Sequence, residues 1–203
     1  MERLPENIRG ILAGLMEDLK SRGSVVSIGL FGSWSRGEAT LSSDVDLLVV
    51  DRRDLKYEYA ERAEIDDIFL DLNYLPERWV LKEFPPEIDQ KIYETKILYD
   101  PEGTLETANN TMRKIMWLPE RVEIRTADHL VKADTLLSRG LSAYERENYR
   151  SAKLNSVLAL ETAMKILIEA SRKLSSNSRY IRTLEASTKK LNLKGLYKEY
   201  LKL

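Results

Sequence analysis

Hydrophobic positions in the first half of the chain change their spacing from one segment to the next. Residues 5–22 carry apolar side chains at every third or fourth position, which predicts an amphipathic helix. Short segments rich in Val, Leu and Ile follow this helix. They predict buried strands over residues 25–31, 44–50, 67–75 and 96–100.

The segments between these strands have helical or turn-like patterns. Helices are expected over residues 77–83 and 104–118, and the GSWSRG segment at 32–37 predicts a turn leading into a short helix. Residues 52–66 are highly charged and fit either a short helix or an edge strand. Residues 1–118 are therefore expected to form an α/β (α+β) domain, in which helices flank a mixed sheet.

Beyond Pro119 the whole pattern is helical. Helices are expected over residues 120–145, 149–174, 178–191 and 193–203. The apolar residues expected to pack the first of these are Leu130, Val131, Leu136, Leu137 and Leu141. One face of the second carries mostly small residues, namely Ala152, Ser156, Ala159, Ala163 and Ile166. We therefore expect an all-α bundle domain over residues 119–203.

The composition excludes several classes of site. The chain has 203 residues, of which 43% are hydrophobic and 32% charged, so it can bury a real core beneath a charged surface. It has no cysteine, which excludes disulfides and thiolate metal sites, and its single histidine, His129, excludes a multi-histidine site. The N-terminus does not resemble a signal peptide, and no window approaches the roughly 18 apolar residues of a membrane span. A cytoplasmic protein is expected.

Charge is distributed unevenly along the chain. Residues 1–100 hold 13 basic and 21 acidic side chains, whereas residues 101–203 hold 19 and 12. The tail at 171–203 holds nine basic and two acidic side chains. Either the halves complement each other across an internal interface, or the basic end contacts phosphate groups or nucleic acid. The first interpretation is favoured, because few aromatic residues lie among the basic ones.

Acidic side chains interrupt two of the predicted strands. Asp44 and Asp46 open an apolar run, and they point the same way because side chains alternate along a strand. Asp71 lies between two leucines of a later strand. If the two strands are neighbours, three carboxylates converge, and their repulsion requires cations. Carboxylate oxygens suit Mg²⁺, and such a set is typical of two-metal phosphoryl transfer.

The GSWSRG turn offers groups that could bind phosphate. Gly32 lets the backbone approach an anion closely, and a turn entering a helix presents free amides. Ser33 adds a hydroxyl and Arg36 a cation. A Walker A loop is excluded, because Glu38 and Ala39 stand where Lys and Ser or Thr are required. Each feature alone has an ordinary structural explanation, but their order and spacing together favour a site.

Together, the segments LFGSWSRG, SSDVDLLVV and IFLDLNYL resemble the nucleotidyltransferase superfamily of the DNA polymerase β type. The GSWSRG form is most similar to the prokaryotic minimal nucleotidyltransferases, with kanamycin nucleotidyltransferase a more distant relative. The resemblance covers roughly residues 25–100. It implies that Asp44 and Asp46 bind two Mg²⁺ or Mn²⁺ ions and that Asp71 helps hold the catalytic ion and can accept a proton.

The same resemblance implies that Gly32 and Ser33 hold the β- and γ-phosphates of a nucleoside triphosphate, with Arg36 a looser candidate. The expected reaction transfers a nucleoside monophosphate, AMP from ATP, to an acceptor hydroxyl and releases pyrophosphate. One ion would activate the hydroxyl and the other would hold the triphosphate. The acceptor stays open among a protein hydroxyl, a small molecule and an RNA 3′ end. The alternative is a catalytically silent, antitoxin-type nucleotide-binding module that acts through protein partners.

The helical half resembles the HEPN-type domains that accompany minimal nucleotidyltransferases. The resemblance rests on Tyr149, Ala152 and the ALETAMK stretch at 159–165, and a generic helix pair is the alternative. The Arg-x4–6-His motif of nuclease members is missing, which argues against ribonuclease activity. We expect this half to bind the acceptor or to form a homodimer. Tyr144 and Tyr149 are candidate stacking groups, although burial is commoner for tyrosine, and Glu161 is expected to pair with Lys165.

Overall fold

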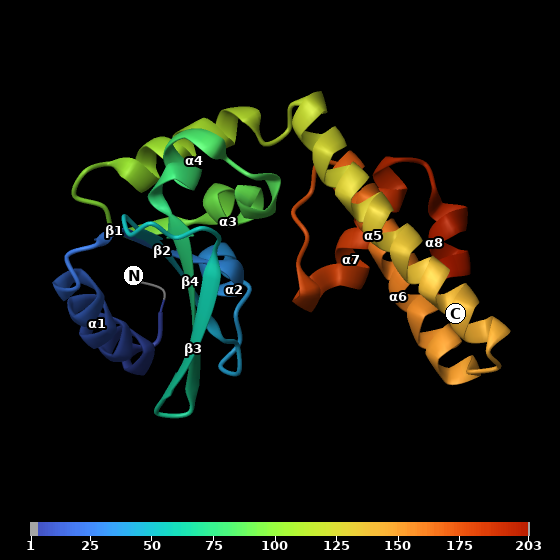
Figure 1. The fold of residues 1–203 in the computed structure, drawn as a ribbon, viewed down its shortest axis with the longest axis horizontal. Coiled ribbons are helices and arrows are strands. Elements are labelled where there is room, and N and C mark those ends of the chain that lie inside the picture. The colour runs from blue at the N-terminus through green and yellow to red at the C-terminus, as the bar shows by residue number, and fades with distance from the viewer. Residues whose placement is uncertain (1–3, 203) are drawn as a thin grey trace. The chain divides into compact units, whose positions relative to one another are not determined.

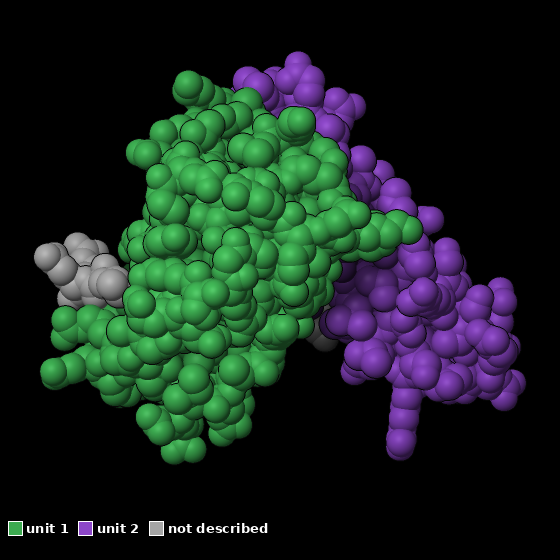
Figure 2. Space-filling model, turned by 60° about the vertical axis from the view of Figure 1, so that its left-hand side comes forward, with its two compact units in different colours: residues 1–116 green, residues 117–203 purple. Residues whose placement is uncertain are grey.

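The computed structural model describes residues 4–202, which form two compact units that divide between Met116 and Trp117 (Figure 2). The boundary expected from the sequence lies two residues later, at Pro119, where the first long helix of the second unit begins. No helix within residues 4–202 combines the length and the apolar character needed to cross a bilayer.

The first unit is built on a five-stranded mixed sheet (Figure 1). Its strands are β1 (Val25–Phe31), β2 (Val45–Asp51), β3 (Tyr59–Ile65), β4 (Ile68–Pro76) and β5 (Lys96–Tyr99). They lie in the order β3-β4-β2-β1-β5. The pair β2 and β4 is parallel, and the other neighbouring pairs are antiparallel. The parallel pair is central to the site, because it brings two predicted strands that are distant in sequence into register.

Helices cover both faces of this sheet. The helical segments of the unit are α1 (Glu6–Ser21), α2 (Gly32–Arg36), η1 (Trp79–Glu83), η2 (Pro86–Ile88), α3 (Asp89–Glu94) and α4 (Thr104–Ile115). Leu12 and Leu19 of α1 are fully buried against Leu47 and its neighbours on one face. On the other face, a Cβ added to Gly29 would touch Leu105 of α4. The predicted fold class, a mixed sheet with flanking helices followed by a helical part, is confirmed.

The sequence prediction left one segment of this unit unassigned and missed another. The charged stretch 52–66, which fitted a helix or an edge strand, forms the edge strand β3. Its register is held by Tyr59 and Tyr74, whose rings stack with centroids 4.6 Å apart. The helix α3 was not predicted, since six residues directly after a 3₁₀ turn are too few to display a helical period.

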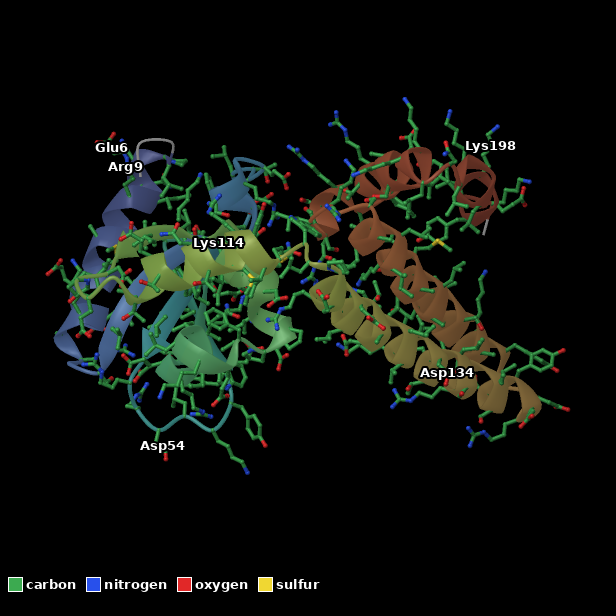
Figure 3. All side chains as sticks on the ribbon, turned by 90° about the horizontal axis from the view of Figure 1, so that it is seen from above. Glu6, Arg9, Asp54, Lys114, Asp134 and Lys198 are labelled. Carbon is green, nitrogen blue, oxygen red and sulfur yellow. The ribbon has the colours of Figure 1, made fainter. Side chains whose placement is uncertain are left out.

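The second unit is entirely helical (Figure 1). Its elements are α5 (Pro119–Glu145), α6 (Tyr149–Ala170), η3 (Asn177–Arg179), α7 (Tyr180–Lys190) and α8 (Lys194–Tyr200). The side chain of Asn148 accepts a hydrogen bond from the Ser151 amide, and this cap fixes the start of α6 soon after α5 ends at Glu145. Side chains tipped with nitrogen, Lys198 among them, project from α7 and α8 (Figure 3).

The seam between α5 and α6 differs from the sequence prediction. The predicted packing residues Leu130, Val131, Leu137 and Leu141 are 46–66% exposed. Small residues are buried instead, namely Ala133, Gly140 and Ala143 on α5 and Ala152 and Ala159 on α6. A Cβ at Gly140 would lie 3.1 Å from the Ser156 hydroxyl oxygen. The helices approach each other at their small residues, which leaves the larger apolar side chains on the outer face.

Two smaller expectations for this unit have opposite outcomes. Tyr144 and Tyr149 are 63% and 60% exposed, so the expectation of buried tyrosines is wrong here. Their rings pack edge to face with centroids 5.6 Å apart, because the two residues flank the hairpin turn. The expected pair of Glu161 and Lys165 is confirmed, with a carboxylate–ammonium distance of 3.7 Å.

Candidate active site

The parallel register of β2 and β4 brings two of the predicted aspartates together. Asp46 and Asp71 are direct Cα partners across the two strands. The residues on either side of them, Val45 and Leu47 on β2 and two leucines on β4, are 0–3% exposed and belong to the core beneath α1. Since side chains alternate along a strand, both aspartates point to the opposite face of the sheet.

Asp44, which lies one residue before β2, reaches the same place through a shared partner. The Nη2 atom of Arg62 donates a hydrogen bond of 2.7 Å to Asp44 Oδ2. The Nε atom of the same guanidinium lies 3.6 Å from Asp71 Oδ1. The structure therefore gathers all three predicted carboxylates at one end of the sheet, with an arginine beside them.

Sequence analysis missed Arg62, and the reason is the open assignment of residues 52–66. Once that segment pairs with β4, Arg62 becomes the Cα partner of Asp71. Tyr59 contributes to the core on the α1 face, so Arg62, three residues later, lies on the carboxylate face. A strand assignment with this register was the signal that could have found it.

The electrostatics of Asp46 reflect this crowding. Burial is the main cause that raises the pKa of Asp46 from 3.8 to about 6, and the negative charges of Asp71, Asp44 and Glu94 contribute to the same increase. The positive charge of Arg36 acts in the opposite direction. A carboxylate in such surroundings gains from a nearby cation, because the cation compensates both the lost hydration and the repulsion.

The glycine turn lies directly against this carboxylate. Gly32 follows β1 with a φ of +70°, and a Cβ added there would collide with the Asp46 side chain. Phe31 and Asp46 are partners in the β1–β2 ladder, which fixes the approach. Both the backbone angle and the lack of space require glycine, so the turn and the carboxylates form one site.

A fourth acidic residue, Glu94, links this turn to α3. Its Oε1 accepts a hydrogen bond of 2.9 Å from the Gly32 amide, and its Oε2 accepts one of 2.6 Å from Arg36. Arg36 also donates to Glu38 at 3.0 Å. The Glu94 side chain is 5% exposed. Two groups that the sequence assigned to phosphate, the Gly32 amide and Arg36, therefore contact Glu94, which sequence analysis missed because α3 was not predicted.

The donor set fits a hard divalent cation in its chemistry. Three carboxylates supply oxygen ligands, and their mutual repulsion favours a bound cation. As the side chains stand, no group of three or more Asp, Glu, His or Cys residues within residues 4–202 is arranged to hold a metal ion. Two of the carboxylates contact Arg62 instead. Gathering all three around an ion requires side-chain rotation in place of these contacts.

Comparison with known proteins decides the family. A family model described as a nucleotidyltransferase domain matches residues 12–124. The chain belongs to this nucleotidyltransferase family. The matched range includes the glycine turn and all three aspartates, and the resemblance inferred from their motifs is confirmed.

Two individual proteins are similar to this nucleotidyltransferase. Over 44 residues it is 50% identical to the protein adenylyltransferase MntA of Thermococcus cleftensis, a match that spans 22% of this chain and 44% of that relative. The solved structure of a nucleotidyltransferase-like protein from Exiguobacterium sibiricum has a similar fold, with a TM-score of 0.54 and 14% identity. That similarity covers 92% of this chain and 64% of the other. The HEPN-type assignment of the helical unit stays a prediction.

Proposed function

We propose that this nucleotidyltransferase transfers AMP from ATP to a hydroxyl group of a protein acceptor, in a reaction that depends on Mg²⁺ or Mn²⁺. The observation that carries the proposal is the in-register pair of Asp46 and Asp71, with Asp44 beside them and the Gly32 turn against Asp46. The choice of AMP and of a protein acceptor is supported by the name of the similar MntA protein, a protein adenylyltransferase.

In this proposal the carboxylates hold the metal ions. Asp44, Asp46 and Asp71 are the ligands, and bound divalent cations supply charge that polarises phosphoryl oxygens and acidifies the attacking hydroxyl. Asp71 has a side chain that is 29% exposed, so an acceptor hydroxyl can reach it from solvent. Asp71 accepts the proton of that hydroxyl, because a solvent-accessible carboxylate can act as a general base for a hydroxyl that approaches it.

The glycine turn orients the triphosphate in the same proposal. Since Gly32 has no side chain, the turn and the Asp46 carboxylate lie in contact, which lets one triphosphate reach both. Ser33 donates its hydroxyl to the phosphates. Arg36 offers positive charge while Glu94 and Glu38 hold its guanidinium in place.

Labelling with α-³²P-ATP tests this function. Wild-type protein with Mg²⁺ is expected to label a protein acceptor in a lysate, and Asp46→Asn is expected to lower the rate by at least about 100-fold because it removes preorganised negative charge. Asp54→Asn is the matched control. Asp54 lies on the exposed loop after β2 and points into solvent (Figure 3), so its substitution should leave the rate unchanged.

The same assay separates the alternatives. Labelled RNA or a labelled small molecule in place of labelled protein would change the acceptor class. ATP binding with no transfer to any fraction would identify a silent nucleotide-binding module. A wild-type rate in Asp46→Asn would refute the carboxylate site itself.

A further inference from the structure

We propose that Arg62 is the resident counter-cation of the carboxylate site, and that a divalent metal ion binds by displacing its guanidinium. Arg62 thereby sets the metal concentration at which the site fills. This inference rests on the proposed function, because it takes Asp44 and Asp71 to be metal ligands.

Three contacts hold the guanidinium at the carboxylates. It lies 2.7 Å from Asp44 Oδ2 and 3.6 Å from Asp71 Oδ1, and its central carbon lies 4.6 Å from the centre of the Phe69 ring. A planar guanidinium with several donors can serve two carboxylates at once and stack on an aromatic face. Arg62 therefore bridges two predicted ligands that would otherwise repel each other.

A metal ion and this guanidinium compete for the same oxygens. The Asp44 oxygen that accepts the 2.7 Å hydrogen bond is one that a metal would use, and a cation of charge +2 placed beside a guanidinium would be repelled by it. Both cannot occupy the carboxylates in the present arrangement. Metal binding therefore includes the cost of releasing Arg62. The apparent affinity equals the intrinsic affinity multiplied by the fraction of molecules in which Arg62 has already left.

The surroundings of Arg62 allow this exchange. Its side chain is 53% exposed and projects from β3, the edge strand of the sheet. The other arginine near the site, Arg36, has a side chain that is 17% exposed and is held by Glu38 and Glu94. Arg62 can rotate into solvent without disturbing the core, whereas Arg36 cannot.

Mn²⁺ binding to the full chain without nucleotide, measured by electron paramagnetic resonance, tests the exchange. If the Arg62 contacts are worth about 1 kcal/mol, Arg62→Gln should tighten Mn²⁺ binding roughly fivefold. Arg52→Gln is the matched control, because Arg52 is 50% exposed and pairs with Glu77 and Glu102. Arg52 follows the C-terminal end of β2, whereas Asp44 precedes its N-terminal end, so removing the Arg52 charge should leave the Mn²⁺ affinity within about twofold of wild type.

A second variant and a second readout make the test independent of one substitution. Arg62→Lys keeps the charge but loses the two-point contact, so its Mn²⁺ affinity should lie between wild type and Arg62→Gln. Without metal, Arg62→Gln should lower the thermal midpoint of unfolding, and saturating Mn²⁺ should remove the difference from wild type. A merely structural arginine would lower the midpoint equally with and without metal.

The outcomes distinguish this inference from the proposed function. Unchanged or weaker Mn²⁺ binding in Arg62→Gln, with normal binding in wild type that Asp46→Asn abolishes, would overturn the exchange and leave the metal site intact. Failure of wild type to bind Mn²⁺, or binding that Asp46→Asn does not affect, would overturn both. Tighter Mn²⁺ binding in Arg62→Gln, with unchanged binding in Arg52→Gln, supports both the exchange and the metal site.

Discussion

Removing the charge of Asp46 should make the metal-free protein more stable while it abolishes transfer. The pKa of Asp46 is raised from 3.8 to about 6, chiefly by burial and by repulsion from Asp71 and Asp44. An increase of that size corresponds to about 3 kcal/mol of destabilisation once the group is ionised. Because Asp46 is only half-buried, solvent screening reduces the expected effect to about 1–2 kcal/mol. Asp46→Asn keeps the shape of the side chain and removes this cost.

The sign of the pH dependence follows from the direction of that pKa. Between pH 4 and 6 the folded state holds the Asp46 proton more tightly than the unfolded state, so the free energy of unfolding falls as pH rises. The stability advantage of Asp46→Asn over wild type should therefore be absent below about pH 4, grow through pH 6 and be complete by about pH 7.

Thermal unfolding in EDTA, from pH 4 to pH 8, measures this advantage. At pH 7.5 the midpoint of Asp46→Asn should lie roughly 3–6 °C above that of wild type. Saturating Mn²⁺ should raise the wild-type midpoint and leave that of the variant unchanged, because the variant lacks the ligand. The exposed control Asp54→Asn should show neither effect. A metal-free Asp46→Asn protein less stable than wild type, or an advantage independent of pH, would refute the electrostatic argument.

Three further substitutions test the packing around the site and in the helical unit. Gly32→Ala should lower the free energy of unfolding by about 1–3 kcal/mol and abolish transfer, since the new methyl group collides with Asp46. Gly37→Ala is the control and should lower stability less, because its φ of +72° is strained but the space beside it is open. Urea denaturation and ATP labelling compare the two variants. Glu94→Gln should destabilise the protein by about 1–3 kcal/mol in urea denaturation, because it removes one of the two carboxylates that pair with Arg36. Gly140→Leu should lower stability by about 1–3 kcal/mol in the same measurement by separating α5 from α6, and an unchanged midpoint would contradict the close approach of the two helices.

The sequence alone predicted four of the five strands and the acidic face of two of them. Buried strands appear as apolar runs because a strand covered on both faces needs few polar residues, and β1 follows its predicted range of 25–31. The alternation of side chains then required Asp46 to point away from Val45 and Leu47. By the same alternation, Asp71 had to point away from the two leucines that flank it on β4. These are local properties, encoded within a few residues.

Only the tertiary structure decided what surrounds those aspartates. Arg62 reaches them because β3 pairs with β4 in one register. Glu94 reaches the glycine turn because the short helix α3, which begins after a 3₁₀ turn, ends beside it. In the helical unit, the choice of Ala133 and Gly140 over Leu130 and Leu137 for the seam depends on how closely α5 approaches α6. Each of these contacts joins segments that are distant in the chain. The local pattern fixes which face a side chain takes, but its partner depends on register and helix spacing, which belong to the folded chain as a whole.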